Sequence, residues 1–380
     1  MRESRVIIDI GSSQLVTLVG ERGVNSTINI IGRGDFSYAG FQNGEFLEPE
    51  SLKFAIANSI SNAEMTSDTK ISEIIIGVPG EFCRVVTKPV TLNFPKAKKI
   101  TSIDVENIFR TGNDFDNDPY YELINHSVVY YDLDNTSRVI DPVSMKAQKI
   151  TGQISYTLAS RYFVSIMRSI FSELKIRING FVCNMLAESL HLFEPSVRDK
   201  YVILVDCGYI STSVALSRGN GLLALNSFSL GGGFITSDLS QCLKIGFSEA
   251  ERLKHKVVLG WNAGANDTYE IGTEEHLQTY SAKSTNEIVS ARIEMICDYI
   301  QKCIDNFIYD LPDFLPVYVT GGGFNFIRGV KNVIANKLNR KVQLISAKGL
   351  YVQRPNDTSE ESLLSLTLYY ADMLDKFIVK

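Results

Sequence analysis

The chain holds 380 residues, more than a single hydrophobic core usually contains, and this length predicts two or three domains. Hydrophobic residues make up 44% and charged residues 21%, which is typical of a globular protein, and a net charge of −5 gives no basic field for nucleic acid. The six cysteines lie far apart without a CxxC pair, which excludes a zinc ribbon and a disulfide scaffold.

The apolar run before Asp9 is too short for a secretory signal, and the longest uncharged window, 219–237, is too rich in glycine for a spanning helix. We therefore expect a cytoplasmic protein with no nucleic-acid partner.

The first part of the chain has the pattern of a mixed α/β unit. Two β-rich runs, VIIDIG and LVTLVGE, are joined by a Gly-Ser turn and predict a hairpin with Asp9 near its tip. A third strand is predicted over 28–36, a helix over 49–64, where apolar residues recur at helical spacing, and a buried strand over 73–80. Strands and a helix in this order indicate a helix packed on a mixed sheet.

A small inserted α+β domain is predicted next. Short β-like runs, Asp/Asn-rich turns and one helix candidate, SIDVENIFRTGN, replace the earlier pattern between residues 82 and 158. The basic stretch KAKK at 96–99 is interpreted as a solvated loop. An amphipathic helix over 162–175, a strand INGFVCN and a second helix through Leu192 then return to the first pattern.

After Pro195 the opening pattern recurs. YVILVDCGYISTSVALSRG repeats the order of VIIDIGSSQLVTLVG: an apolar strand, an Asp-x-Gly turn, a hydroxyl cluster and another strand. This similarity predicts a duplicated half. The later elements expected in chain order are a strand with a triple glycine and a helix, a helix over 248–258, a polar loop over 261–283, a long helix over 286–311, the strand PVYVTGGG, a helix over 328–338, the strand VQLIS and a closing helix from Glu361.

Glycine turns at strand ends are the candidate chemical sites. Asp9-Ile-Gly11 and Asp206-Cys-Gly208 occur at equivalent places in the two halves, and Gly231–Gly233 and Gly321–Gly323 add two clusters. Glycines let backbone N–H groups approach phosphate oxygens, and an aspartate at a strand end can hold hydrated Mg²⁺ beside them. Neither a P-loop nor a GxGxxG turn occurs in the chain.

The order DIGSSQLVTLVGE, DCGYISTSVA, LGGGFITSD, EAERLK, VTGGGFNFIRG resembles the phosphate and adenosine motifs of the actin, Hsp70 and sugar-kinase superfamily. Within it, the chain is identified as a divergent member of the FtsA family of bacterial cell-division proteins. GGxxTxD over 232–238 and the insertion after IIIGVPG are the traits that carry this resemblance. It implies an actin-like, ribonuclease H-like α/β fold with duplicated domains around a nucleotide cleft. The implied subdomains are 1A (1–81 plus 163–195), inserted 1C (82–162), 2A (196–245 plus 312–380) and 2B (246–311).

The resemblance also implies ATP and Mg²⁺ as cofactors. The residues implied to contact them are Asp9, Gly11, Ser12, Ser13, Asp206, Gly208, Ser211, Gly232, Gly233, Glu251, Lys254, Gly321, Gly322 and Gly323, with Asp9 and Asp206 nearest the metal. Four positions depart from the family pattern. Gln14 stands where a phosphate-facing lysine is usual, Tyr209 and Ile210 replace glycines, and Phe324 replaces a small residue and is expected to crowd the adenine. These changes predict weak or degenerate nucleotide binding, and no catalytic residue is assigned.

The implied partner is the C-terminal tail of FtsZ, bound on 246–311 through Asn286 and Arg292, since an arginine suits an acidic peptide. Self-association end to end through the inserted domain is a second implied property, and head-to-tail contact propagates into filaments. Attachment to the membrane at the division site is expected only through a partner or a missing tail. Two alternatives stay open: a pilus-assembly protein resembling PilM, and a small-molecule kinase of the same superfamily.

Overall fold

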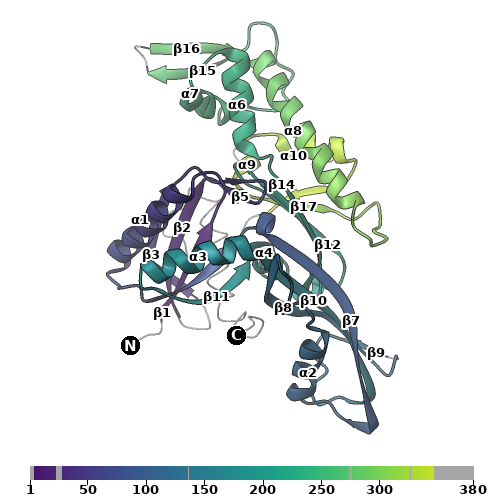
Figure 1. Cartoon of the computed structure of the whole chain (residues 1–380). Coiled ribbons are helices and arrows are strands. Elements are labelled where there is room, and N and C mark those ends of the chain that lie inside the picture. The colour runs from purple at the N-terminus through teal and green to yellow at the C-terminus, as the bar shows by residue number, and fades with distance from the viewer. Residues whose placement is uncertain (1–3, 23–27, 136, 274–275, 326, 346–380) are drawn as a thin grey trace.

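The computed structural model describes residues 4–22, 28–135, 137–273, 276–325 and 327–345 (Figure 1). Three hydrophobic cores organise these residues, one in each half of the molecule and a smaller one in the insertion at the bottom of Figure 1. The closing helix predicted from Glu361 lies outside the described residues. No helix of the described part is long and apolar enough to cross a membrane.

The first half is built on a mixed five-stranded sheet of order β11-β6-β1-β2-β3. Its strands are β1 (Ser4–Ile10), β2 (Gln14–Arg22), β3 (Ile28–Ser37), β6 (Glu73–Val78) and β11 (Arg177–Cys183). The helices around it are α1 (Pro49–Ser67), α3 (Arg161–Glu173) and α4 (Asn184–Leu192), with the short β4 (Phe41–Gln42), β5 (Glu45–Phe46) and η2 (Gly80–Phe82). Helix α1 lies along β2 and β3 because Leu52, Ile56 and Ile60 recur on one face and are buried.

The second half repeats this sheet strand for strand. Its order is β14-β13-β12-β17-β18, with β12 antiparallel to β13 and parallel to β17 just as β1 is antiparallel to β2 and parallel to β6. The strands are β12 (Val202–Cys207), β13 (Thr212–Arg218), β14 (Gly221–Phe228), β17 (Val317–Thr320) and β18 (Val342–Leu344). The helices are α5 (Pro195–Arg198), α6 (Gly232–Leu243), α9 (Gly322–Asn325) and α10 (Val330–Leu338). The predicted duplication is therefore confirmed.

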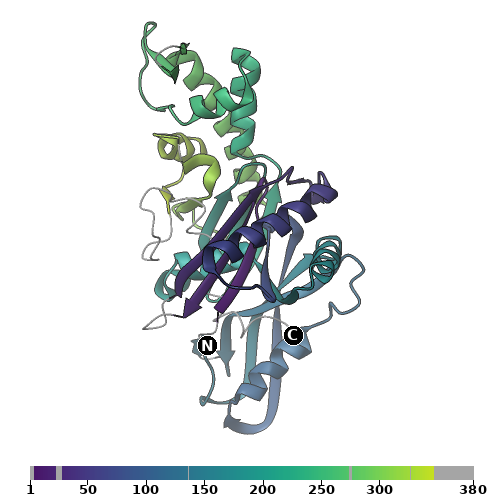
Figure 2. The same ribbon diagram turned by 90° about the vertical axis from the view of Figure 1, so that its left-hand side faces the viewer.

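The insertion in the first half is a four-stranded antiparallel sheet with one helix (Figures 1 and 2). It consists of β7 (Cys83–Lys99), α2 (Ser102–Gly112), β8 (Tyr121–Leu133), β9 (Ser137–Val139) and β10 (Lys146–Ser160). Helix α2 begins with a capping box, in which Thr101 and Asp104 hydrogen-bond each other's backbone N–H. The stretch 96–99, predicted as a loop, is instead the end of β7, because β10 pairs with it from Lys146 onward.

The upper part of Figure 1 holds α6, α7 (Phe247–Lys254), β15 (Thr268–Thr273), β16 (His276–Ser281) and α8 (Ala282–Asp305). The hairpin β15–β16 corrects the polar loop predicted over 261–283. In β15, Tyr269 and Ile271 face the core while Glu270 and Gly272 are exposed, and an alternation with two apolar positions is too short to predict a strand. The long helix begins at residue 282 rather than 286, because Ser281 caps it, and ends at 305 rather than 311.

Candidate functional site

A cavity of about 240 Å³ lies where the two sheets meet. Asp9 closes β1 and Asp206 closes β12, so the duplicated strands bring both carboxylates to it from opposite halves. The predicted residues that line the cavity are Asp9, Gly11, Ser12, Ser13, Asp206, Gly208, Ser211, Glu251, Lys254, Gly321 and Gly322. Gly232, Gly233 and Gly323 do not line it. A Cβ on Gly232 would lie 2.6 Å from the Gly323 Cα, so these two glycines serve a close backbone contact with each other.

The two Asp-x-Gly turns touch each other directly. The N–H of Ile210 donates to the Ser12 Oγ at 3.0 Å across the cleft, and the Ile210 side chain reaches the backbone around Gly40. In the second turn the Gly208 N–H is also engaged, donating to the Ser211 carbonyl at 2.9 Å. A phosphate between these turns would have to separate them and replace the Ser12–Ile210 hydrogen bond.

Tyr209 fills the space beside the second turn. A Cβ on Gly233 would lie 2.7 Å from the Tyr209 ring, and the Lys254 ammonium lies 5.4 Å from the ring centroid. Burial, followed by the charge of Glu251, raises the pKa of Tyr209 to about 12, so the phenol stays neutral at physiological pH. Gly233 was predicted to face the nucleotide, but this aromatic ring covers it.

Glu251 and Lys254 lie on one face of α7 and bind each other. The Lys254 Nζ lies 2.7 Å from the Glu251 Oε1 and also donates to the Thr236 Oγ1 at 3.0 Å and to the Gly232 carbonyl at 3.3 Å. Lys254 is 3% exposed, and burial lowers its pKa. The three ammonium hydrogens therefore have protein acceptors already, and a ligand would have to compete for them.

A third carboxylate, which belongs to none of the glycine-turn motifs, lies below the floor of the cavity. Glu188 follows Asn184 by one turn of α4 and is 1% exposed, and within the described chain neither of its carboxylate oxygens has a hydrogen-bond partner. Burial, then the charges of Asp206 and Asp9, raise the pKa of Glu188 well above its usual range. The single carboxylate in the run NMLAESLHL was the available signal. Asn184 itself donates to the Asp9 Oδ1 at 2.6 Å.

The aspartate of the GGxxTxD motif pairs with the predicted partner-binding arginine. Arg292 on α8 donates from Nε to the Asp238 Oδ2 at 2.5 Å and from a terminal nitrogen to Oδ1 at 2.8 Å, and both side chains are about one quarter exposed or less. The guanidinium also lies near the Phe234 ring and the Met295 sulfur. Asn286, the second predicted contact, accepts from the Tyr269 hydroxyl and donates to the Val258 carbonyl. Asn286 therefore holds the β15–β16 hairpin against α8.

Comparison with known proteins settles the family. The model of the family described as cell division protein FtsA matches residues 203–365. Over 97% of this chain and 80% of the relative, the sequence is 24% identical to the cell division protein FtsA of Staphylococcus epidermidis. The FtsA of Bacillus subtilis is 24% identical over 93% of this chain and 81% of its own length. This chain belongs to the FtsA family.

Solved structures confirm the actin-like fold expected of an FtsA-family protein. A PilM–PilN type IV pilus biogenesis complex matches with a TM-score of 0.61 at 14% identity over 98% of this chain and 97% of that chain. MreB5 of Spiroplasma citri bound to AMPPNP matches with a TM-score of 0.55 at 11% identity, over 98% of this chain and 96% of that chain. At these identities the likeness describes the fold alone.

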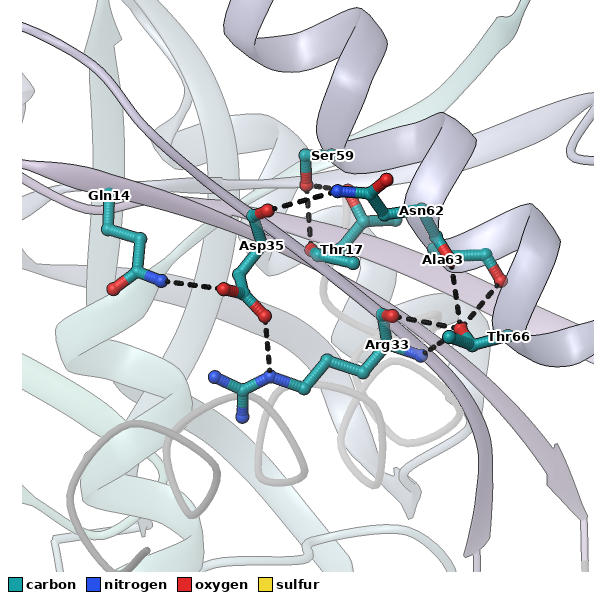
Figure 3. Close-up of polar contacts among 9 residues, drawn as sticks. Gln14, Thr17, Arg33, Asp35, Ser59, Asn62, Ala63 and Thr66 are labelled. Atoms are coloured by element: carbon teal, nitrogen blue, oxygen red, sulfur yellow. Dashed lines mark hydrogen bonds and ion pairs between the residues drawn. The ribbon is translucent and has the colours of Figure 1, made fainter.

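Two departures from the FtsA-family pattern have different structural consequences. Gln14 lines the cavity, and its amide donates to the Asp35 carboxylate at 3.1 Å, which Arg33 also contacts (Figure 3). Phe324 was expected to crowd the adenine, and this expectation is wrong. Its side chain is fully buried in the core of the second half, because α9 begins at Gly322 and turns it away from the cavity.

Gly321 lies directly against the Asp206 carboxylate in this FtsA-family cleft. Its φ is +92°, and a Cβ there would lie 2.2 Å from the Asp206 Oδ1. Only glycine adopts this backbone conformation readily and also leaves room for the carboxylate. The triple glycine therefore shapes the acidic end of the cavity.

The charge of Asp206 is expected to make the stability of this FtsA-family chain fall as pH rises. Burial raises the pKa of Asp206 from 3.8 to about 6, so the folded state holds a proton that the unfolded state has lost between these values. The resulting penalty grows as pH rises through about 6 and is complete above about pH 7, where Asp206→Asn should raise the free energy of unfolding by about 3 kcal/mol. Urea unfolding at pH 5 and pH 8 checks this.

Because Asp206 is more fully ionised at pH 8 than at pH 5, the gain from Asp206→Asn should be larger at pH 8. A gain that does not grow with pH would contradict the raised pKa.

Proposed function

We propose that this FtsA-family cell-division protein is an adaptor that binds FtsZ at the division site, on the cytoplasmic side of the membrane, and that its cleft binds nucleotide weakly or not at all. One observation carries the proposal: protein groups already fill part of the nucleotide cleft, whereas a partly exposed arginine on α8 lies beside the exposed side chain of Met295. The relatives' shared name, cell division protein FtsA, supports the choice of process.

The cleft fits the metal better than the nucleotide. Asp9 and Asp206 are oxygen ligands of the kind that Mg²⁺ accepts together with waters, although the described residues hold no cluster of three or more metal-ligating side chains. The cavity of about 240 Å³ is smaller than the roughly 300–1,000 Å³ of typical small-molecule sites. The Tyr209 ring fills space beside the second turn, and the Ser12–Ile210 hydrogen bond holds the two turns together where a phosphate would have to lie. We therefore propose no hydrolytic step.

The proposed tail-binding surface is the seam between α6 and α8. Arg292 offers the planar fork that binds carboxylates in pairs, and it already binds one in Asp238. Met295 is 45% exposed beside it, and Phe234 lies beneath the guanidinium. An acidic tail with apolar side chains can take the place of Asp238 on the guanidinium while it covers Met295. Binding of the tail is then an exchange of carboxylates.

This exchange predicts opposite effects for two substitutions. Arg292→Met keeps the apolar stem but removes the fork, and should weaken binding of an FtsZ C-terminal tail peptide by about tenfold or more, the value of a charge-assisted hydrogen bond. Asp238→Asn removes the competing charge and should strengthen binding severalfold. Fluorescence anisotropy with a labelled peptide and the full chain measures both. Arg252→Met, on an exposed face of α7 in the same subdomain, is the matched control and should leave affinity unchanged.

If Asp238→Asn weakens binding as much as Arg292→Met, the pair merely supports the fold, and the tail binds elsewhere or not at all.

We also propose the subdomain limits 1A (1–81 plus 163–195), 1C (82–162), 2A (196–245 plus 312–380) and 2B (246–311), and self-association head to tail through 1C. The separate core and sheet within residues 83–160 support 1C as a unit. A head-to-tail contact joins different surfaces of two copies, so it can extend into a filament.

A further inference from the structure

The tip of the insertion carries a concentration of positive charge that the proposed binding of FtsZ does not use. We define the tip as residues 94–104, which end β7 and begin α2, and residues 140–149, which lead into β10. It lies at the bottom of Figure 1, at the far end from β15 and β16. These two segments contain five lysines against two aspartates, and no arginine. The lysines are Lys96, Lys98, Lys99, Lys146 and Lys149.

Two of these lysines repel each other across the sheet. Lys99 on β7 is the direct partner of Lys146 on β10, so both side chains leave the same face, and both are exposed. Like charges directly opposite each other destabilise a strand pair. Asp104 neutralises the neighbouring Lys98 at 2.8 Å, but within the described chain no acidic side chain pairs with Lys96, Lys99 or Lys146. An anionic surface would relieve this repulsion.

Exposed apolar side chains lie among the lysines. Ile103, in the first turn of α2, is 68% exposed, and Val143 and Met145 are each more than a third exposed. The Ile100 N–H donates to the Met145 carbonyl at 2.8 Å, and the Ser144 N–H donates back to the Ile100 carbonyl at 2.9 Å. These bonds tie the start of α2 to the loop before β10, so the two segments that carry the three apolar groups are held together.

We propose that the tip docks on an anionic lipid surface. Lysines surround exposed apolar groups, which is the composition of segments that lie at a membrane interface, with charge on the headgroups and apolar side chains at the acyl boundary. A specific peptide carboxylate would favour the planar fork of arginine, which the tip lacks, whereas a diffuse layer of lipid charge suits flexible ammonium groups. This docking does not depend on FtsZ binding, because Arg292 lies in the other half of the molecule.

Vesicle flotation of the full chain tests the proposal. One set of vesicles contains phosphatidylglycerol and phosphatidylcholine in equal parts, and the other contains phosphatidylcholine alone. The chain should float with the first set at low salt, and rising salt should release it, because the attraction is screened. Each lysine near an anionic surface contributes roughly fivefold to binding, so Lys99→Glu, which reverses a charge, should lower the affinity by about tenfold or more.

Lys99→Glu also separates docking from folding. It places a glutamate opposite Lys146, so the melting temperature should stay the same or rise while vesicle binding falls. Ile103→Ser should weaken binding without changing net charge. The control Lys331→Glu, an exposed lysine on α10, has the same change in net charge and should keep full binding.

Three results would each overturn the proposal: no flotation of the unaltered chain, equal flotation of Lys99→Glu and the unaltered chain, or equal losses in Lys99→Glu and Lys331→Glu.

Discussion

Replacing Phe82 by alanine is expected to lower the free energy of unfolding by about 3–5 kcal/mol, the usual range for removing a buried aromatic ring. Phe82 is 2% exposed and packs on Phe41, Phe46 and Phe163 with ring centroids 4.9–5.3 Å apart. It immediately precedes Cys83, where the insertion leaves the first half, so its ring anchors that junction. Urea unfolding followed by tryptophan fluorescence and circular dichroism measures the loss.

The matched control is Phe314→Ala, because Phe314 is 84% exposed and its removal should change stability by about 0.5 kcal/mol or less. A loss below about 1 kcal/mol for Phe82→Ala would contradict the aromatic cluster, because cavity formation alone exceeds that value.

Opening the second turn is expected to restore nucleotide binding. The double substitution Tyr209→Gly with Ile210→Gly removes the ring that covers Gly233 and the side chain that reaches Gly40. We expect the affinity for Mg-ATP to rise by about tenfold to a hundredfold, since two bulky side chains no longer have to be displaced. Thermal shift with Mg-ATP and with a non-hydrolysable analogue reports this, because ligand at 100 times its Kd stabilises the folded state by about 2.7 kcal/mol.

The control for this experiment is Tyr120→Gly with Ile308→Gly, which removes the same side chains from exposed positions. It should leave the response to Mg-ATP unchanged. Tight binding by the unaltered chain, at micromolar Mg-ATP, would contradict the view that Tyr209 and the Ser12–Ile210 contact fill the site.

Much of the fold could be predicted because its signals are local. Each half begins with an apolar strand, an Asp-x-Gly turn and a second strand, and these short patterns identify the duplication without any long-range information. The β15–β16 hairpin could not be predicted in the same way. It is held by contacts of Tyr269 with Asn286 and Val258, which are far apart in the sequence.

The site was predictable only in part for a related reason. The glycine turns bring Asp9 and Asp206 together because equivalent strands end at the same place in both halves. The direction of each side chain at those turns depends on how the halves pack. Tyr209 turns toward Gly233, and Phe324 turns into the core, although the sequence places both beside a glycine turn. Glu188 is buried among other carboxylates that approach it only in the folded state.

We propose that this FtsA-family chain works through its partner surface without help from nucleotide. Co-sedimentation of the full chain with FtsZ filaments, with and without Mg-ATP, tests it most directly. We predict saturable binding that is equal under both conditions and is lost in Arg292→Met but kept in Arg252→Met. Absence of binding, or binding that appears only with Mg-ATP, would contradict the claim.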